Sequence, residues 1–140
     1  MVGKDPNIVA SALRDKNHGY SVSMISTEAA KRLALFVTRG QHDVDRFINR
    51  KTRKALGDAG HGERVYQNVC AACHGFDGKA INFKDDKNPE YIGTVASDNP
   101  WETLHKIRNG QPGAPMPALR FLPTQILVDI LAYSQTLPAK

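Results

Sequence analysis

The segment Cys70-Ala71-Ala72-Cys73-His74 has the residue types and spacing of a site that holds a cofactor covalently. On a helical turn, cysteines three positions apart present both sulfur atoms to one side, where they can form thioether bonds with the two vinyl groups of one porphyrin. The histidine that comes directly after them can then reach the iron. This C-x-x-C-H spacing is the signature of a c-type haem, and the chain contains no other cysteine.

A cysteine pair of this spacing also occurs in redox dithiols and in zinc sites. A zinc site needs two further ligands at ordered spacing, whereas the remaining histidines are scattered singly along the chain. They are His18, His42, His61 and His105. A redox dithiol needs a thioredoxin-like βαβ context, which the sequence lacks. Haem attachment is therefore favoured over both alternatives.

A second candidate ligand, Met116, lies in the segment Gly110-Gln111-Pro112-Gly113-Ala114-Pro115-Met116-Pro117-Ala118-Leu119. Its prolines remove backbone donors and fix φ, while its glycines allow close approach to a flat ring, so the segment is predicted to be a non-helical loop. Methionine often fills gaps in a core, but core methionines usually lie on periodic helix faces. In electron carriers the sixth position of the iron is often filled by methionine. Met116 is therefore predicted to be an axial ligand, with His105 as the alternative.

Residues 59–140 resemble a class I c-type cytochrome of the mono-haem bacterial type. Gly62-x-x-x-Tyr66-x-x-x-Cys70 resembles the first helix of that family, where a small and an aromatic residue face the last helix. Leu127-x-x-Ile130-x-x-Tyr133, with Leu137-Pro138 after it, resembles that last helix. The resemblance implies an all-α cytochrome c fold, with three main helices around a covalently attached haem. Additional helices are expected at the N-terminus.

The resemblance also implies roles for residues outside the attachment motif. One haem c is expected, with its iron held by His74 and Met116. The Pro89 carbonyl is expected to accept a hydrogen bond from Nδ1 of His74, which would fix the tautomer and raise the basicity of the ligand. Independently of the resemblance, Trp101 is expected to form a wall of the haem pocket, and Arg108 and Lys106 are candidates either to pair with propionates or to be surface cations.

Capping residues and apolar periodicity predict a chain that is nearly all helical, with no convincing strand. Ser26 and Asp58 are suitable N-caps, as is either Asn99 or Asp98 before Pro100, a residue that suits a first helical turn. The predicted helices cover approximately residues 26–40, 43–57, 60–72, 100–110 and 123–137.

Residues 1–58 lie outside the cytochrome pattern and are predicted to form a helical N-terminal extension. The segment Ile25–Phe36 can be laid over Leu122–Tyr133, so the extension is either a vestigial cytochrome tail or an unrelated amphipathic helix. The apolar stripe of Leu33, Phe36 and Val37 must be buried somewhere. The haem domain and a second copy of the chain are the two expected partners, and the second would give a homodimer.

The positive charge of the chain is concentrated in the extension. Residues 1–58 contain eleven Lys or Arg against six Asp or Glu, whereas residues 59–140 contain eight of each. A basic cluster can bind nucleic acid, but a haem protein outside the cytoplasm rarely meets nucleic acid, so that hypothesis is discounted. Contact with the haem domain, or steering towards an acidic redox partner, is favoured.

The first residues lack the apolar stretch of a secretory signal, and no apolar run approaches the length of a membrane span. Haem attachment takes place after export in the bacterial family, so the resemblance implies a periplasmic protein whose signal peptide is absent from this chain. The expected function is one-electron transfer between redox proteins, without enzymatic activity. Two alternatives stay open: a haem subunit of a larger oxidoreductase docked through residues 1–58, and an open-site haem enzyme or gas-binding protein.

Overall fold

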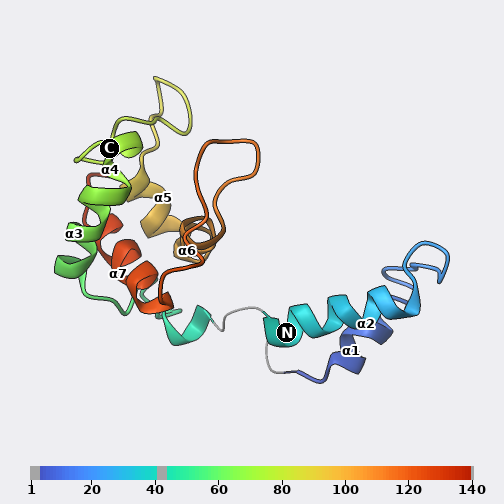
Figure 1. Cartoon of the computed structure of the whole chain (residues 1–140). Helices are drawn as coiled ribbons and strands as arrows, with labels where there is room; N and C mark the ends of the chain where they lie inside the picture. Colours follow the sequence, from blue (N-terminus) through green and yellow to red (C-terminus); the bar gives the residue numbers. More distant parts are fainter. Residues whose placement is uncertain (1–3, 41–43, 140) are drawn as a thin grey trace. The chain divides into compact units, whose positions relative to one another are not determined.

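The computed structural model describes residues 4–40 and 44–139, and these form two compact units. The first unit comprises Met1–Asp43 and the second comprises Val44–Lys140. Helices are the only regular elements in the described ranges, apart from one isolated bridge between Ile48 and Ala55 (Figure 1). The expectation of an all-α chain is confirmed. None of the helices described is both long and apolar enough to span a membrane.

The first unit pairs helix α1 (Pro6–Ala12) with helix α2 (Thr27–Leu35), which continues into a π-helical turn, η1 (Phe36–Gly40). The predicted cap is confirmed, because the Ser26 side chain accepts a hydrogen bond from the Ala29 amide. Sequence reasoning missed α1, whose seven residues are too few for a clear apolar period.

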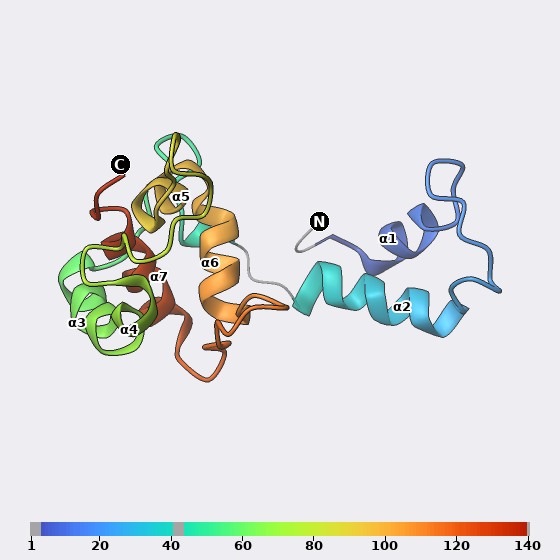
Figure 2. The same ribbon diagram turned by 90° about the horizontal axis from the view of Figure 1, so that it is seen from above.

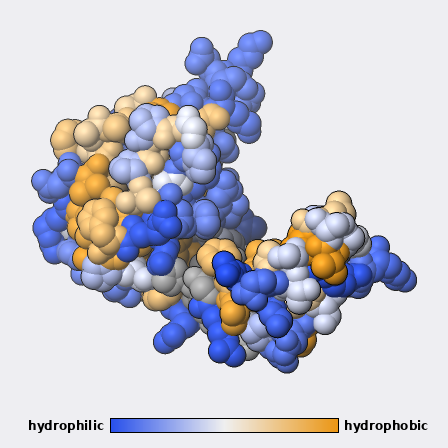
Figure 3. All heavy atoms as spheres, turned by 45° about the vertical axis from the view of Figure 1, so that its right-hand side comes forward, coloured by the Kyte–Doolittle hydropathy of each residue, from blue (hydrophilic) through white to orange (hydrophobic). Residues whose placement is uncertain are grey.

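The core of the first unit is small, and several of its large apolar side chains are exposed. Ala30 and Ala34 of α2 are buried, whereas Leu33 is 40% and Phe36 is 57% exposed. Figure 3 shows hydrophobic side chains reaching the surface. Within the described residues, the apolar stripe predicted on this helix is therefore only partly covered, at Val37.

The second unit is built on the contact between helix α3 (Ala59–Val69) and helix α7 (Thr124–Ser134). Helix α5 (Ile92–Asp98) and helix α6 (Pro100–Asn109) pack against α7, and the short helix α4 (Ala71–His74) continues from α3 (Figures 1 and 2). The buried side chains of these elements form one core, which includes Tyr66, Leu104, Ile107, Leu127, Ile130 and Leu131.

The crossing of α3 and α7 depends on the absence of a side chain at Gly62. A Cβ atom at this position would lie 1.9 Å from the backbone oxygen of Asp129. One turn later, the Tyr66 ring packs on the Tyr133 ring with centroids 5.2 Å apart. The predicted close crossing, with tyrosines packed about it, is confirmed.

The predicted helix over residues 43–57 is wrong. Asp43 lies outside the described residues, and the chain after it forms a single 3₁₀ turn, η2 (Val44–Arg46), and then a hairpin. Arg53 has φ of 59°, a left-handed conformation that interrupts any helix. The hairpin closes where Ile48 bridges Ala55, and Ile48 is 1% exposed in the core of the second unit.

Because of this hairpin, the boundary between the two compact units differs from the boundary expected from the sequence. Residues 44–58 pack with the second unit, so the units divide after Asp43 rather than after Asp58. The functional extension of residues 1–58 stays a prediction, and its last fifteen residues belong structurally to the same unit as the attachment motif.

The remaining predicted helices are present, with small shifts at their ends. Asp58 caps α3 by accepting from the His61 amide, and Asn99 caps α6 by accepting from the Glu102 amide. Pro100 occupies the first turn of α6, as predicted. Helix α5 was not foreseen, because its small residues show no apolar period.

Candidate haem-binding site

Cys70, Cys73 and His74 lie on one tight turn, as their spacing predicts. The turn joins the end of α3 to α4, and the amides of Cys73 and His74 both donate to the Cys70 carbonyl, at 3.2 and 3.0 Å. Both cysteines are free thiols; Cys70 is half-buried and Cys73 is exposed. Their attachment to haem stays a prediction that this geometry allows.

Burial favours the neutral forms of Cys70 and His74 on this turn. Burial, with a smaller contribution from Cys73, raises the pKa of the Cys70 thiol to about 11. Burial also lowers the pKa of the His74 imidazole. The neutral imidazole is the form that binds a metal, so the burial of His74 prepares it for an iron.

One ring nitrogen of the half-buried His74 lacks a hydrogen-bond partner among the described residues. Its Nδ1 atom is buried and has no hydrogen-bond partner. Buried polar atoms without a partner are rare and require an explanation. Because Nδ1 is the nitrogen expected to donate to the Pro89 carbonyl, the other ring nitrogen remains for an iron, and two thiols beside it fit a covalently attached haem.

The expected bond from His74 Nδ1 to the Pro89 carbonyl is not made in this structure. The loop between α4 and α5 instead closes on itself, since the Phe83 amide donates to the Glu90 carbonyl and the Glu90 amide donates to the Asn82 side chain. This closure places the Phe83 ring beside His74, with ring centroids 6.2 Å apart. Sequence reasoning missed Phe83, because a lone aromatic residue in a charged stretch carries no periodic signal.

Tyr66 holds the chain in place where it leaves the motif. Its hydroxyl donates to the Gly75 carbonyl at 3.0 Å. Burial raises the pKa of Tyr66, so the hydroxyl stays protonated and available as a donor. The residue that packs the α3–α7 crossing therefore also fixes the turn after His74.

The loop that carries Met116 is non-helical, as predicted, and is closed at its base. Gly110 has φ of 72°, and a Cβ atom there would lie 2.6 Å from the Met116 carbonyl oxygen. The Gln111 amide donates to that same carbonyl. The backbone of the half-buried Met116 is thus held against the end of α6, while its role as a ligand stays a prediction.

Helix α6 carries the other predicted contacts. Trp101 is partly buried and packs against the core, and Arg108 is half-buried near the end of the helix. Lys106 is paired with Glu102 at 2.9 Å. His105, the alternative ligand, is exposed, and its ring lies 3.2 Å from the side-chain nitrogen of Asn109. Burial therefore favours Met116 over His105 as the residue that faces a bound ring.

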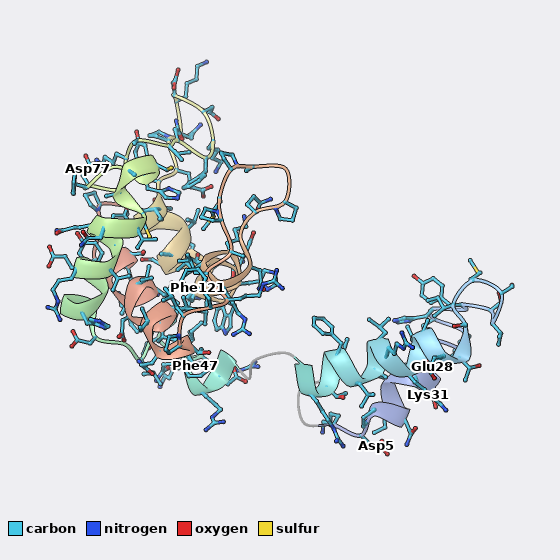
Figure 4. The ribbon with its side chains drawn as sticks, viewed as in Figure 1. Asp5, Glu28, Lys31, Phe47, Asp77 and Phe121 are labelled. Carbon is cyan, nitrogen blue, oxygen red and sulfur yellow. The ribbon has the colours of Figure 1, made fainter. Side chains whose placement is uncertain are left out.

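Several apolar side chains near the motif in sequence are open to solvent. Val69 is 45% and Phe76 is 71% exposed, and they flank the attachment turn in the chain. Phe121, which comes after the methionine loop, is 79% exposed and is labelled in Figure 4.

Comparison with known proteins identifies the family of the second unit. A family model described as "Cytochrome C oxidase, cbb3-type, subunit III" matches residues 57–133, which is more than half of the chain and includes the attachment motif and the methionine loop. No curated protein and no solved structure matches the chain. The match confirms the resemblance to c-type cytochromes and implies a covalently bound c-type haem. The chain therefore belongs to this family of cytochrome c domains, whose members transfer electrons through a c-type haem.

Proposed function

We propose that this protein is a periplasmic one-electron carrier with one haem c, whose iron is held by His74 and Met116. The observation that carries the proposal is the attachment turn. It presents two thiols beside a half-buried imidazole that burial keeps neutral, which is the form that binds a metal. Export to the periplasm is supported by membership of a c-type family.

When bound, the haem supplies a one-electron couple. The contribution of the chain is to hold both ligands in place. His74 is fixed by the short turn of α4, and Met116 by a loop whose base is closed at Gly110. Fixed ligands limit the rearrangement that accompanies electron transfer, and a methionine ligand raises the reduction potential.

The exposed side of the attachment turn is the proposed surface for redox partners. Cys73, Val69 and Phe76 are all exposed there, so a partner can approach the thioether edge closely. Trp101, Arg108 and Pro89 keep their proposed roles at the haem, as pocket wall, propionate partner and carbonyl acceptor. The last of these requires the loop of residues 82–90 to shift from the closed form described above.

The assignment of Met116 is tested by replacing it. In Met116→Ala the weak band near the red edge of the oxidised spectrum, which reports iron–methionine ligation, should disappear. The reduction potential should fall and carbon monoxide should bind. His105→Ala is the matched control and should leave all three properties unchanged. If the wild type lacks the band, and carbon monoxide binds to His105→Ala but not to Met116→Ala, His105 is the ligand; if the wild type lacks the band and itself binds carbon monoxide, the site is open.

The family description favours a second candidate function, a haem subunit of a terminal oxidase. In that case the same electron transfer takes place within an assembly, and residues 1–58 supply the docking arm. Native mass measurement of the protein purified from its source distinguishes the two functions. A free monomer or homodimer supports the carrier, and a stoichiometric complex with oxidase subunits supports the subunit.

A further inference from the structure

Residues 46–54, from the last residue of η2 through the hairpin that follows, carry the excess positive charge of the second unit, and this segment is the basic hairpin. This basic hairpin contains five Lys or Arg residues and no Asp or Glu. Residues 59–140 contain eight of each sign. The second unit is therefore electrically asymmetric, with its excess positive charge gathered in nine consecutive residues.

The tip of the basic hairpin has a fixed backbone. The Asn49 side chain accepts hydrogen bonds from the amides of Lys51 and Thr52, both at 3.0 Å. The Asn49 amide donates to the Lys54 carbonyl, and the Arg53 amide donates to the Asn49 carbonyl. The charged side chains are thus presented from an ordered turn.

The hairpin is also fastened to two helices by the Gln135 side chain. This side chain accepts from the Ala55 amide at 3.0 Å and donates to the Arg53 carbonyl at 2.7 Å and the Ala96 carbonyl at 3.0 Å. The Arg53 guanidinium donates to the Asp98 carbonyl, at the end of α5. The hairpin cannot move independently of α5 and α7 without breaking these bonds.

Arg53 adopts a backbone conformation that side chains other than glycine rarely accept. Its φ of 59° lies in the left-handed region, where the Cβ atom crowds the carbonyl oxygen. Glycine would remove that strain, yet the position carries a cation. Strained residues of this kind concentrate at binding sites.

The basic hairpin lies away from the attachment turn. Figure 4 labels Phe47, on the first arm of the hairpin, and Asp77, three residues after the motif; they lie at opposite ends of the second unit. In Figure 1 the turquoise segment that follows residue 43 likewise lies low in the second unit, whereas α4 lies near its top. A partner bound at the hairpin therefore leaves the attachment turn open.

We propose that the basic hairpin binds the acidic surface of a partner protein and holds the cytochrome unit on it. The proposal rests on the proposed function, because it supplies a docking surface separate from the electron-transfer edge. Arg50 is engaged with Asp45 at 2.7 Å and Arg53 with α5, so the exposed Arg46, Lys51 and Lys54 supply the contacts.

The chemistry of the hairpin favours a protein carboxylate surface over a lipid bilayer. Its tip, Asn49-Arg50-Lys51-Thr52, has no aromatic or aliphatic side chain to insert among acyl chains, as surface-bound membrane segments require. Its cations are presented from a fixed backbone, which suits a structured acidic surface.

The test uses the full-length haem-loaded protein, with a short oligoglutamate peptide as the probe. Lys51→Glu/Lys54→Glu should weaken peptide binding about tenfold or more. The matched control, Lys84→Glu/Lys87→Glu, changes the net charge equally on the exposed loop before α5 and should bind like the wild type. In NMR titrations of the wild type, shifts should be confined to residues 45–56.

Three results would overturn the proposal. Equal losses in the two variants would mean that net charge alone attracts the peptide. Shifts spread over the whole surface would exclude a specific site. Binding to anionic phosphatidylglycerol vesicles that is lost in the hairpin variant, with no peptide binding, would assign the surface to a membrane. The oxidised spectrum checks that both variants are folded. It also reports Met116 ligation independently of peptide binding. The proposed axial ligation can therefore prove wrong while the peptide-binding result still stands.

Discussion

The buried carboxylate of Asp129, on α7, bonds to residues at the start of α3. It is 4% exposed, and one oxygen accepts from the Asp58 amide at 2.9 Å and from the Gln125 side chain at 3.0 Å. The other oxygen lies 2.7 Å from His61 Nδ1. Burial alone would raise the pKa of Asp129, but the hydrogen bonds from His61, Asp58 and Gln125 outweigh it and the pKa is lowered.

Asp129→Asn should destabilise the protein by about 1 to 3 kcal/mol at neutral pH, because an NH₂ donor replaces one of the oxygens that accept these bonds. A carboxylate with a lowered pKa in the folded state contributes stability above its ordinary pKa, near 3.8. That contribution is lost as the pH falls through the folded-state pKa.

Urea unfolding at neutral pH and at about pH 3 measures both effects. The difference between wild type and variant should shrink at the lower pH, since the wild-type carboxylate is then being protonated. A difference that is the same at both values would show that the charge of Asp129 contributes nothing to stability.

For single residues, the sequence was enough to predict the candidate haem ligands. It was not enough to predict residues whose role depends on a hydrogen-bond partner far away in the chain. Cys70, Cys73 and His74 are recognisable by their spacing, and Met116 by its loop. In the sequence Asp129 is an ordinary polar position on an amphipathic helix, because its partner Asp58 lies about seventy residues earlier in the chain.

At the scale of elements, two glycines of α3, Gly62 and Gly60, allow the α3–α7 crossing to be tested. Gly62→Ala would put a methyl group 1.9 Å from the Asp129 oxygen, so the helices must separate, at a cost of about 3 kcal/mol or more. Gly60→Ala is the control on the same helix. Its Cβ would meet only the Asp58 side-chain oxygen that caps the helix, at 3.3 Å, so the small shift of that side chain offsets the gain in helix propensity and stability should change little.

The melting temperature should therefore fall strongly in Gly62→Ala and change little in Gly60→Ala. Both proteins carry one added methyl group on α3, so composition cannot account for the difference. Equal melting temperatures would show that the crossing tolerates a side chain, and that the close approach has no energetic role.

Elements set by local chemistry could be predicted, and those set by distant partners could not. Ser26, Asp58 and Asn99 cap helices as their positions predict, because a cap needs only the next three residues. The hairpin at residues 46–54 resembles a helix in its apolar spacing. Its actual form depends on Gln135, which no local pattern around Arg53 reveals.

At the scale of the whole chain, the boundary between the units predicts the result of two truncations. A protein that begins at Val44 retains the buried Ile48 and the Ala55–Gln135 bond, whereas one that begins at Gly57 loses both. Both retain the attachment motif and the methionine loop, so both should bind haem with the same ligands.

The shorter protein should be less stable by at least about 2 kcal/mol, the usual cost of emptying a buried isoleucine site. Denaturant unfolding of the two haem-loaded proteins measures this difference. Equal stability would show that residues 44–56 are an independent arm. The extension would then end at Asp58, as predicted from the sequence, and not at Asp43, where the compact units divide.

The contact between α3 and α7 also has a kinetic consequence. It joins the first α-helix of the second unit to the last one, and the bond from Asp58 to Asp129 spans 71 positions. Closing so large a loop costs entropy before any contact compensates for it. The order of folding events is therefore set by topology. Local turns such as α4 can form early, whereas the pairing of the terminal helices, on which the core depends, must await a non-local encounter that limits the folding rate.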